Sequence, residues 1–244
     1  MPDRNAAPDD SGRPAPTTPL VVAIDGPSGS GKSSTARGVA QKLGLAFLDT
    51  GAMYRAATWL VLHSDISAAD VDAVADLVRA ARIDIALDPT APSIRINGTD
   101  VTEAIREPVV SAAVSSVATN LGVRADLVAR QQAIIAGSER GIVAEGRDIT
   151  TVVAPDAPVR VLLVADPAAR VARRQAELGH RVSGAEVTDQ VIRRDRDDST
   201  VAKFTEAAEG VEVVDSTHKT LSEVIDVIAG LADRVSGPDE LVAS

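Results

Sequence analysis

The amino-acid sequence predicts an α/β protein in which a five-stranded parallel sheet lies between layers of helices. Short apolar runs of strand length recur along the chain and alternate with helical patterns. Unbroken apolar runs are typical of strands that are buried on both faces, as in a parallel sheet covered by helices. The five predicted strands are 20–24, 45–48, 142–144, 159–164 and 211–214.

Composition narrows the class of protein. The chain has 244 residues, of which 45% are apolar, and this fits one compact domain with insertions. It contains no cysteine, which excludes disulfides and thiolate metal sites, and we expect a cytoplasmic location. No apolar run approaches the roughly 18 residues that a membrane span needs, so we expect no membrane partner. The net charge of −10 argues against nucleic acid as a partner.

The two ends of the chain differ in composition from the rest. Residues 1–19 contain five prolines and almost no apolar side chain, which is typical of a disordered tail. Residues 237–244 are expected to form a flexible C-terminus. Between the ends we expect core structure in 20–60, 126–166 and 199–236, interrupted by two segments of different character.

These two segments break the alternation of strands and helices. Within the first, 61–125, a stretch at 83–101 alternates apolar and polar residues and contains Pro and Asn-Gly turns, which predicts a small antiparallel β insertion. The second, 167–198, has too few apolar positions for a central core and indicates two polar helices joined at LGHRVSG. We expect this second segment to form a mobile helical lid.

The stretch DGPSGSGKSS joins the first predicted strand to a helix and carries the spacing GxxxxGK[ST]. Its glycines let backbone N–H groups surround a polyphosphate, and the following helix presents its positive end to the same point. Lys32 can bridge the outer phosphates, and Ser33 can ligate Mg²⁺. The spacing therefore predicts a phosphate-binding loop (P-loop) for a nucleoside triphosphate, made of Gly26, Pro27, Ser28, Gly29, Ser30, Gly31, Lys32, Ser33 and Ser34.

Four segments that contain arginine could surround a transferring phosphoryl group. They are DTGAMYR at 49–55, EGRD at 145–148, the cluster of Arg170, Arg173 and Arg174, and RRDRDD at 193–198. The first two follow directly on predicted strands, so they lie at the carboxyl edge of the sheet, where the P-loop also opens. We expect the side chains to converge there, although the arginine cluster could also be a solvated helix face.

The segments DGPSGSGKSS, LDTGAMYR, EGRDITTVV and RRDRDDST resemble those of bacterial cytidylate kinases and occur in the same order. This family belongs to the P-loop nucleoside-monophosphate kinases, and the resemblance covers about residues 20–234. It implies a three-layer α/β/α fold with a monophosphate-binding region at 61–125 that contains the β insertion. It also implies phosphoryl transfer from ATP, with Mg²⁺, to CMP or dCMP, so the expected partners are these small nucleotides.

The resemblance further implies roles for individual residues. Contacts with the cytosine base are implied for Thr50, Arg124 and Asp148. Contacts with the sugar are implied for Ser115, Arg194 and Asp198, and contacts with the acceptor phosphate for Ser28, Arg55 and Arg147. The groups implied to be catalytic are Lys32, Arg147, Arg174 and Arg194. The residue types suit these roles, because carboxylates accept from amines and hydroxyls while guanidinium groups fork onto phosphate oxygens.

The chain departs from the family at one position. Cytidylate kinases commonly carry an arginine two residues after the serine of RDxxDS, as a further ligand of the acceptor phosphate, and here that position is Val201. We expect Lys203 to compensate in part, as a point charge without the planar fork of arginine.

Two alternatives to a cytidylate kinase stay open at the level of sequence. Within the same class, UMP or AMP could be the acceptor. In a different class, a nucleotide switch or regulatory ATPase would bind the triphosphate without a small acceptor. The chain has no NKxD segment of the kind that confers GTP specificity, but the apolar runs that end at Asp49 and Asp215 could each supply a metal-binding aspartate. We expect a monomer in either case.

Overall fold

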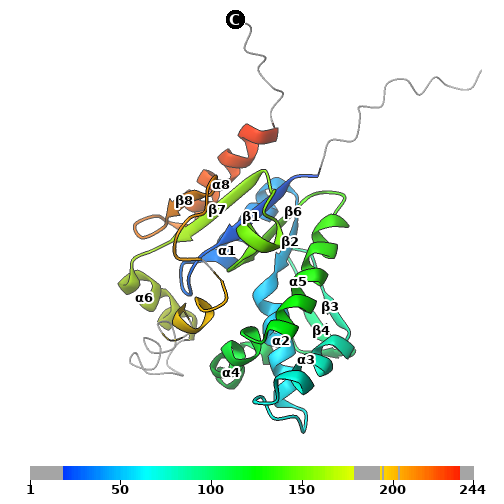
Figure 1. The fold of residues 1–244 in the computed structure, drawn as a ribbon. Helices are drawn as coiled ribbons and strands as arrows, with labels where there is room; N and C mark the ends of the chain where they lie inside the picture. The colour runs from blue at the N-terminus through cyan, green and yellow to red at the C-terminus, as the bar shows by residue number, and fades with distance from the viewer. Residues whose placement is uncertain (1–18, 179–192, 194, 203, 237–244) are drawn as a thin grey trace, which may run out of the picture.

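The computed structural model describes residues 19–178, 193, 195–202 and 204–236 (Figure 1). The predicted tail up to residue 18, the C-terminus at 237–244 and most of the second half of the predicted lid lie outside these residues. Arg194 and Lys203 lie outside them as well.

The central sheet is five-stranded and parallel, as predicted. Its strands are β1 (Val21–Asp25), β2 (Ala46–Asp49), β6 (Ile142–Gly146), β7 (Val159–Val164) and β8 (Glu212–Asp215). Their order across the sheet is β2-β6-β1-β7-β8. Each strand matches one of the five apolar runs to within one or two residues, because strands that are buried on both faces read as unbroken apolar sequence.

Helices cover both faces of this sheet and complete the three layers (Figure 1). On one face, α1 (Lys32–Leu43) and α8 (Leu221–Ser236) pack Val39 and Ile228 against Ile24 and Leu163. The other face is covered by α2 (Thr50–Leu62), α3 (Val71–Ala80), α4 (Pro108–Ala118) and α5 (Leu121–Ala136). The two hydrophobic cores therefore meet at β1, whose Val22, Ala23 and Ile24 are fully buried.

The order of the strands brings the predicted site segments together. The central strand β1 pairs with β6, which pairs in turn with β2, and all three run in the same direction. In this register Asp25 lies opposite Gly146, and Asp49 lies opposite Glu145. The P-loop, the start of α2 and the EGRD segment consequently leave the sheet at one edge, as expected for adjacent parallel strands.

The predicted β insertion is also present. Strands β3 (Ile83–Ile85), β4 (Ile94–Ile96) and β5 (Thr99–Asp100) form an antiparallel sheet of their own. Asn97 and Gly98 both have positive φ, 50° and 81°, which is the geometry that Asn-Gly favours in a tight hairpin turn. Ile94 and Ile96 are buried in the same core as α2, and the short turn η1 (Ala104–Arg106) follows the insertion.

Only part of the predicted lid is described. Its first helix, α6 (Pro167–Leu178), follows β7, and residue 193 and residues 195–198 are helical. The joining segment LGHRVSG lies outside the described residues apart from Leu178. Among the described residues, no helix combines the length and the apolar character that crossing a bilayer requires.

The single tryptophan and the single tyrosine of the chain both lie on α2. Tyr54 is buried on the side of the core. Trp59 stacks on His63 at the end of the helix, with ring centroids 4.1 Å apart and an interplanar angle of 22°. The aromatic content of the chain is only 2%, so small aliphatic side chains fill most of the core.

Asp25 at the end of β1 fixes the segment that follows β6. Its carboxylate accepts from the backbone N–H of Ile149 at 2.9 Å and from the N–H and hydroxyl of Thr150 at 2.8 and 2.6 Å. These residues begin the helical turn η2 (Ile149–Val153). Burial raises the pKa of Asp25, although the three hydrogen bonds oppose this change. The contacts hold the EGRD segment beside the P-loop.

We expect Asp25→Ala to lower the free energy of unfolding by about 2–4 kcal/mol, because the buried donors of Ile149 and Thr150 lose their acceptor. Urea denaturation measures this loss. Asp84→Ala is the control: Asp84 pairs with Arg82 on the surface, and its removal should cost less than about 0.5 kcal/mol. Equal losses in the two variants would show that other contacts hold η2.

Candidate active site

The P-loop turns between β1 and α1 and packs closely against its neighbours. Gly29 has φ of 76°, and a Cβ placed there would lie 2.5 Å from the carbonyl oxygen of Arg170 on α6. A Cβ on Gly26 would lie 2.2 Å from the carbonyl oxygen of Leu163 on β7. Both positions therefore require glycine, and the predicted lid helix begins in direct contact with the loop.

Lys32 and Ser33 begin α1 beside a buried carboxyl group. The Lys32 ammonium donates to the carbonyl of Pro27 at 2.8 Å, and the Ser33 hydroxyl donates to Oε1 of Glu145 at 2.5 Å. Burial, and then the negative charge of Asp49, raise the pKa of Glu145 to about 7. An acidic group thus stands next to the hydroxyl that the sequence assigns to Mg²⁺.

Glu145 was not among the residues predicted from the sequence. Of the aspartates considered for metal binding, Asp49 accepts from the N–H of Ala52 and caps α2, and Asp215 accepts from the N–H and hydroxyl of Thr217. Glu145 ends a predicted apolar run in a strand adjacent to β1. The sequence shows that Glu145 follows an apolar run, but it does not show that the strand formed by this run lies next to β1.

Arg147 connects several of the residues predicted to bind the acceptor. Its Nε lies 2.9 Å from Asp198, its Nη1 lies 3.0 Å from Asp195, and its guanidinium carbon lies 4.4 Å from the centre of the Phe204 ring. Asp198 also accepts from the hydroxyl of Ser115 at 3.1 Å. Two residues predicted to bind the sugar and one predicted to bind phosphate are therefore in contact with one another.

Asp195 is a further residue that the sequence reasoning did not assign. It accepts from the N–H of Ser28 at 2.9 Å and pairs with both Arg147 and Arg170. The only signal for it was its place in the quoted segment RRDRDDST.

The residues predicted to bind the base lie around the start of η2. Arg124 on α5 forms an ion pair with Asp148, and both side chains are mostly buried. Burial raises the pKa of Asp148, while the charge of Arg124 opposes this. Thr50 at the start of α2 donates to the carbonyl of Glu145 at 2.8 Å. Among the described contacts Asp148 pairs with Arg124, whereas the neighbouring Arg147 pairs with Asp195 and Asp198.

Arg55 lies at the centre of a group of positive charges. Its guanidinium donates to the hydroxyl of Ser111 at 2.9 Å and to the carbonyl of Ile105 at 3.3 Å. Burial, and then the charge of Arg174, lower its pKa to about 10, and Arg106 and Arg147 contribute in the same direction. An anionic ligand bound here would reduce the repulsion among these positive charges.

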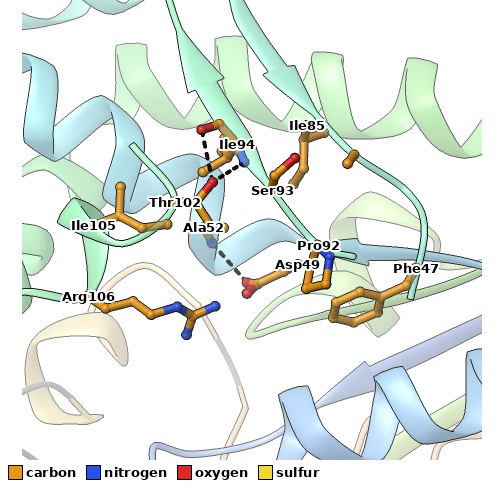
Figure 2. A pocket seen from close by; sticks show the side chains of 11 residues that line it. Phe47, Asp49, Ala52, Ile85, Pro92, Ser93, Ile94, Thr102, Ile105 and Arg106 are labelled. Atoms are coloured by element: carbon orange, nitrogen blue, oxygen red, sulfur yellow. Dashed lines mark hydrogen bonds between the residues drawn. The ribbon is translucent and has the colours of Figure 1, made fainter. Parts of the chain in front are cut away.

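Arg106 borders a small pocket between α2, β4 and η1. Figure 2 shows its guanidinium and the carboxylate of Asp49 turned toward the same space, with Phe47 and Pro92 on the opposite side. Arg106 is exposed and was not predicted as a site residue, because it follows the β insertion rather than a central strand.

The three arginines of α6 have different neighbours. Arg170 donates to the carbonyl of Ser28 at 3.1 Å and pairs with Asp195. Arg173 binds the hydroxyl and carbonyl of Ser216 at 2.9 and 2.6 Å, which anchors α6 to the end of β8. Arg174 is near enough to Arg55 to lower its pKa. The cluster is thus not a solvated face, while Arg194 lies outside the described residues.

Comparison with known proteins gives consistent matches. The family model described as cytidylate kinase matches residues 22–234. A cytidylate kinase of Cutibacterium acnes is 58% identical over 217 residues, which are 88% of this chain and 96% of the relative. One from Streptomyces avermitilis is 42% identical over 220 residues, 88% of this chain and 93% of the relative. A bifunctional pantoate ligase/cytidylate kinase of Prochlorococcus marinus is 45% identical over 230 residues, 91% of this chain and 44% of that longer protein.

We expect Glu145→Gln to change how stability depends on pH. The pKa of Glu145 is about 7 in the folded protein, against 4.5 for the ordinary side chain. Between these two values the folded state keeps a proton that the unfolded chain releases, so the wild type loses stability as the pH rises through this range. Gln does not titrate. Without nucleotide or metal, the stability of the variant relative to wild type should therefore rise by up to about 3 kcal/mol across the window. Urea denaturation at a series of pH values measures it, and a constant difference would contradict the burial of a neutral Glu145.

Proposed function

Because the chain belongs to the cytidylate kinase family, we propose that its P-loop holds ATP and that the residues around β6, α2, α4 and α5 hold the acceptor. The chain is a nucleoside-monophosphate kinase, a phosphotransferase that converts CMP and dCMP to their diphosphates. One observation carries the assignment of the site. A series of contacts runs from Ser115 through Asp198, Arg147 and Asp195 to Ser28, and so joins the proposed acceptor side to the P-loop.

In the donor half, residues 26–34 bind the phosphates of ATP. The backbone N–H groups of the loop and the start of α1 favour negative charge. The ammonium of Lys32 neutralises charge between the outer phosphates, where charge develops during transfer. Its present contact with the carbonyl of Pro27 keeps it beside the loop.

The oxygen atoms beside Ser33 fit Mg²⁺. The Ser33 hydroxyl and the Glu145 carboxyl are hard oxygen donors 2.5 Å apart, and among the described residues no group of three or more acidic or histidine ligands forms a separate cage. This suits an ion that takes most of its ligands from water and nucleotide phosphates. Ser33 would be a direct ligand and Glu145 would orient bound water. When bound, the ion would neutralise charge on the transferring group.

In the acceptor half, Thr50, Arg124 and Asp148 read the base. The carboxylate of Asp148 accepts from the exocyclic amine of cytosine, and the guanidinium of Arg124 donates to the ring acceptors. A base without that amine would leave the mostly buried Asp148 without its hydrogen bond. The carboxylate of Asp198 accepts from the sugar hydroxyls, the hydroxyl of Ser115 can donate to them or accept from them, and Arg194 is proposed to donate to them as well.

Ser28, Arg55 and Arg147 hold the acceptor phosphate, and Arg174 adds charge as the donor phosphoryl group approaches. The guanidinium groups offer paired donors that match phosphate oxygens. The acceptor is already an anion, so the reaction needs no obvious general base. The residues act by positioning the two nucleotides in line and by neutralising the charge between them.

A coupled assay of ADP release tests this function. With ATP and Mg²⁺ we expect rapid release with CMP and dCMP, and little with UMP or AMP. Release that is equally fast without any acceptor would contradict transfer to a monophosphate and would favour an ATPase.

Asp148→Ala tests the reading of the base. We expect kcat/KM for CMP to fall by an amount equivalent to about 2–4 kcal/mol of lost transition-state stabilisation, because a buried hydrogen-bond acceptor is lost. The Kd for ATP measured without CMP should hardly change. Asp156→Ala, at an exposed aspartate of the same segment, is the matched control and should behave as wild type. An equal weakening of ATP and CMP binding by Asp148→Ala would make Asp148 a structural residue.

Val201→Arg tests the departure from the family pattern. A charge-assisted hydrogen bond contributes about 1.5–3 kcal/mol, so we expect KM for CMP to fall roughly tenfold or more, with KM for ATP nearly unchanged. Thr200→Arg adds the same charge at an exposed neighbouring position and should have a smaller effect. If Val201→Arg leaves the KM for CMP unchanged, Ser28, Arg55 and Arg147 already hold the phosphate fully. The compensating role of Lys203, the cytoplasmic location and the monomeric state stay predictions.

A further inference from the structure

Asp195 lies where three elements of the proposed site meet. Its Oδ1 accepts from the Ser28 N–H of the P-loop at 2.9 Å and from Nη1 of Arg147, which follows β6, at 3.0 Å. Its Oδ2 accepts from Nη1 of Arg170 on α6. The side chain is only 13% exposed, so these contacts are shielded from solvent. No other described carboxylate makes contacts with all three elements.

The carboxylate of Asp195 is ionised in this setting. Burial alone would raise its pKa, but the charge of Arg147 and the hydrogen bonds from the Ser28 N–H and from Arg170 outweigh burial and lower the pKa. One negative charge therefore holds two guanidinium groups and a backbone N–H of the P-loop in a fixed arrangement. Charge-assisted hydrogen bonds of this kind are short and directional.

The orientation of Arg147 is fixed on three sides. Asp198 holds its Nε, Asp195 holds its Nη1, and the fully buried ring of Phe204 lies against its face. Nη2 takes no part in these contacts. Without Asp195 the guanidinium would keep its charge but could turn about the remaining Asp198 contact, and Arg170 would lose its carboxylate partner.

We propose that Asp195 is a positioning residue for phosphoryl transfer, which orients Arg147 and Arg170 against the P-loop. This inference rests on the proposed role of Arg147 in binding the acceptor phosphate. Asp195 acts through the two arginines and not through contact with either nucleotide. Because small errors in the placement of a catalytic group can reduce a rate by roughly a hundredfold, its loss should affect kcat more than binding.

The test compares Asp195→Asn with Asp197→Asn. Asp197 lies two residues further on, and its side chain pairs only with the exposed Arg196 among the described contacts, so the change is chemically matched. We expect Asp195→Asn to lower kcat by about ten- to a hundredfold. The KM values for ATP and CMP should stay the same or fall, because both guanidinium groups keep their charge and lose a competing carboxylate. Asp197→Asn should have wild-type kinetics, and thermal unfolding should show both variants to be folded.

A double-mutant cycle with Arg170→Met supplies the second readout. If Asp195 acts by holding Arg170, the variant with both changes should be hardly slower than the slower of the two single variants. Additive losses would overturn this route. A rise in KM for ATP with unchanged kcat would overturn the proposal as well, and would make Asp195 a structural support of the loop. Lower KM values with unchanged kcat would show instead that Asp195 only competes with phosphate.

Arg147→Met separates this proposal from the function on which it rests. An inactive Arg147→Met beside a fully active Asp195→Asn would overturn the role of Asp195 and leave the kinase site in place. A fully active Arg147→Met would overturn the assignment of the acceptor phosphate site, and with it the reason for positioning Arg147.

Discussion

The place of β1 between β6 and β7 determines where the proposed catalytic groups lie. Because these strands are parallel and buried on both faces, their carboxyl ends open at one edge and deliver the P-loop and the EGRD segment side by side. Asp25 then ties the end of β1 to the start of η2 through three hydrogen bonds. The same backbone that builds the core thus sets the distance between the proposed donor and acceptor halves.

Around that edge, carboxylates hold several of the arginines in place. Asp198 and Asp195 hold Arg147, and Asp148 holds Arg124. Arg55 differs, because its hydrogen-bond partners are a hydroxyl and a carbonyl and its neighbours include further cations. Charges held in fixed directions need less rearrangement when the transition state forms, and this is the electrostatic advantage of a preorganised site.

Much of this architecture could be predicted from the sequence, because buried strands, Asn-Gly turns and the P-loop spacing each have a local physical cause. The parallel sheet and the insertion of β3, β4 and β5 follow from such patterns. Glu145 and Asp195 could not be assigned in the same way. The position of Glu145 matters because its strand lies next to β1. Asp195 matters because Arg147 and Arg170 reach it from elsewhere in the chain. Neither fact follows from local sequence. Arg173 shows the same limit, since its partner Ser216 is 43 residues away.

The two chromophores of α2 give the molecule an unusual optical property. All tryptophan and tyrosine absorbance near 280 nm arises from one helix, which begins at Thr50 and also carries Arg55. Since Trp59 is stacked on His63 at the far end of that helix, its emission depends on the geometry of a single turn. Intrinsic tryptophan and tyrosine fluorescence therefore reports on α2, on the proposed acceptor side, while the P-loop and α6 contain no tryptophan or tyrosine.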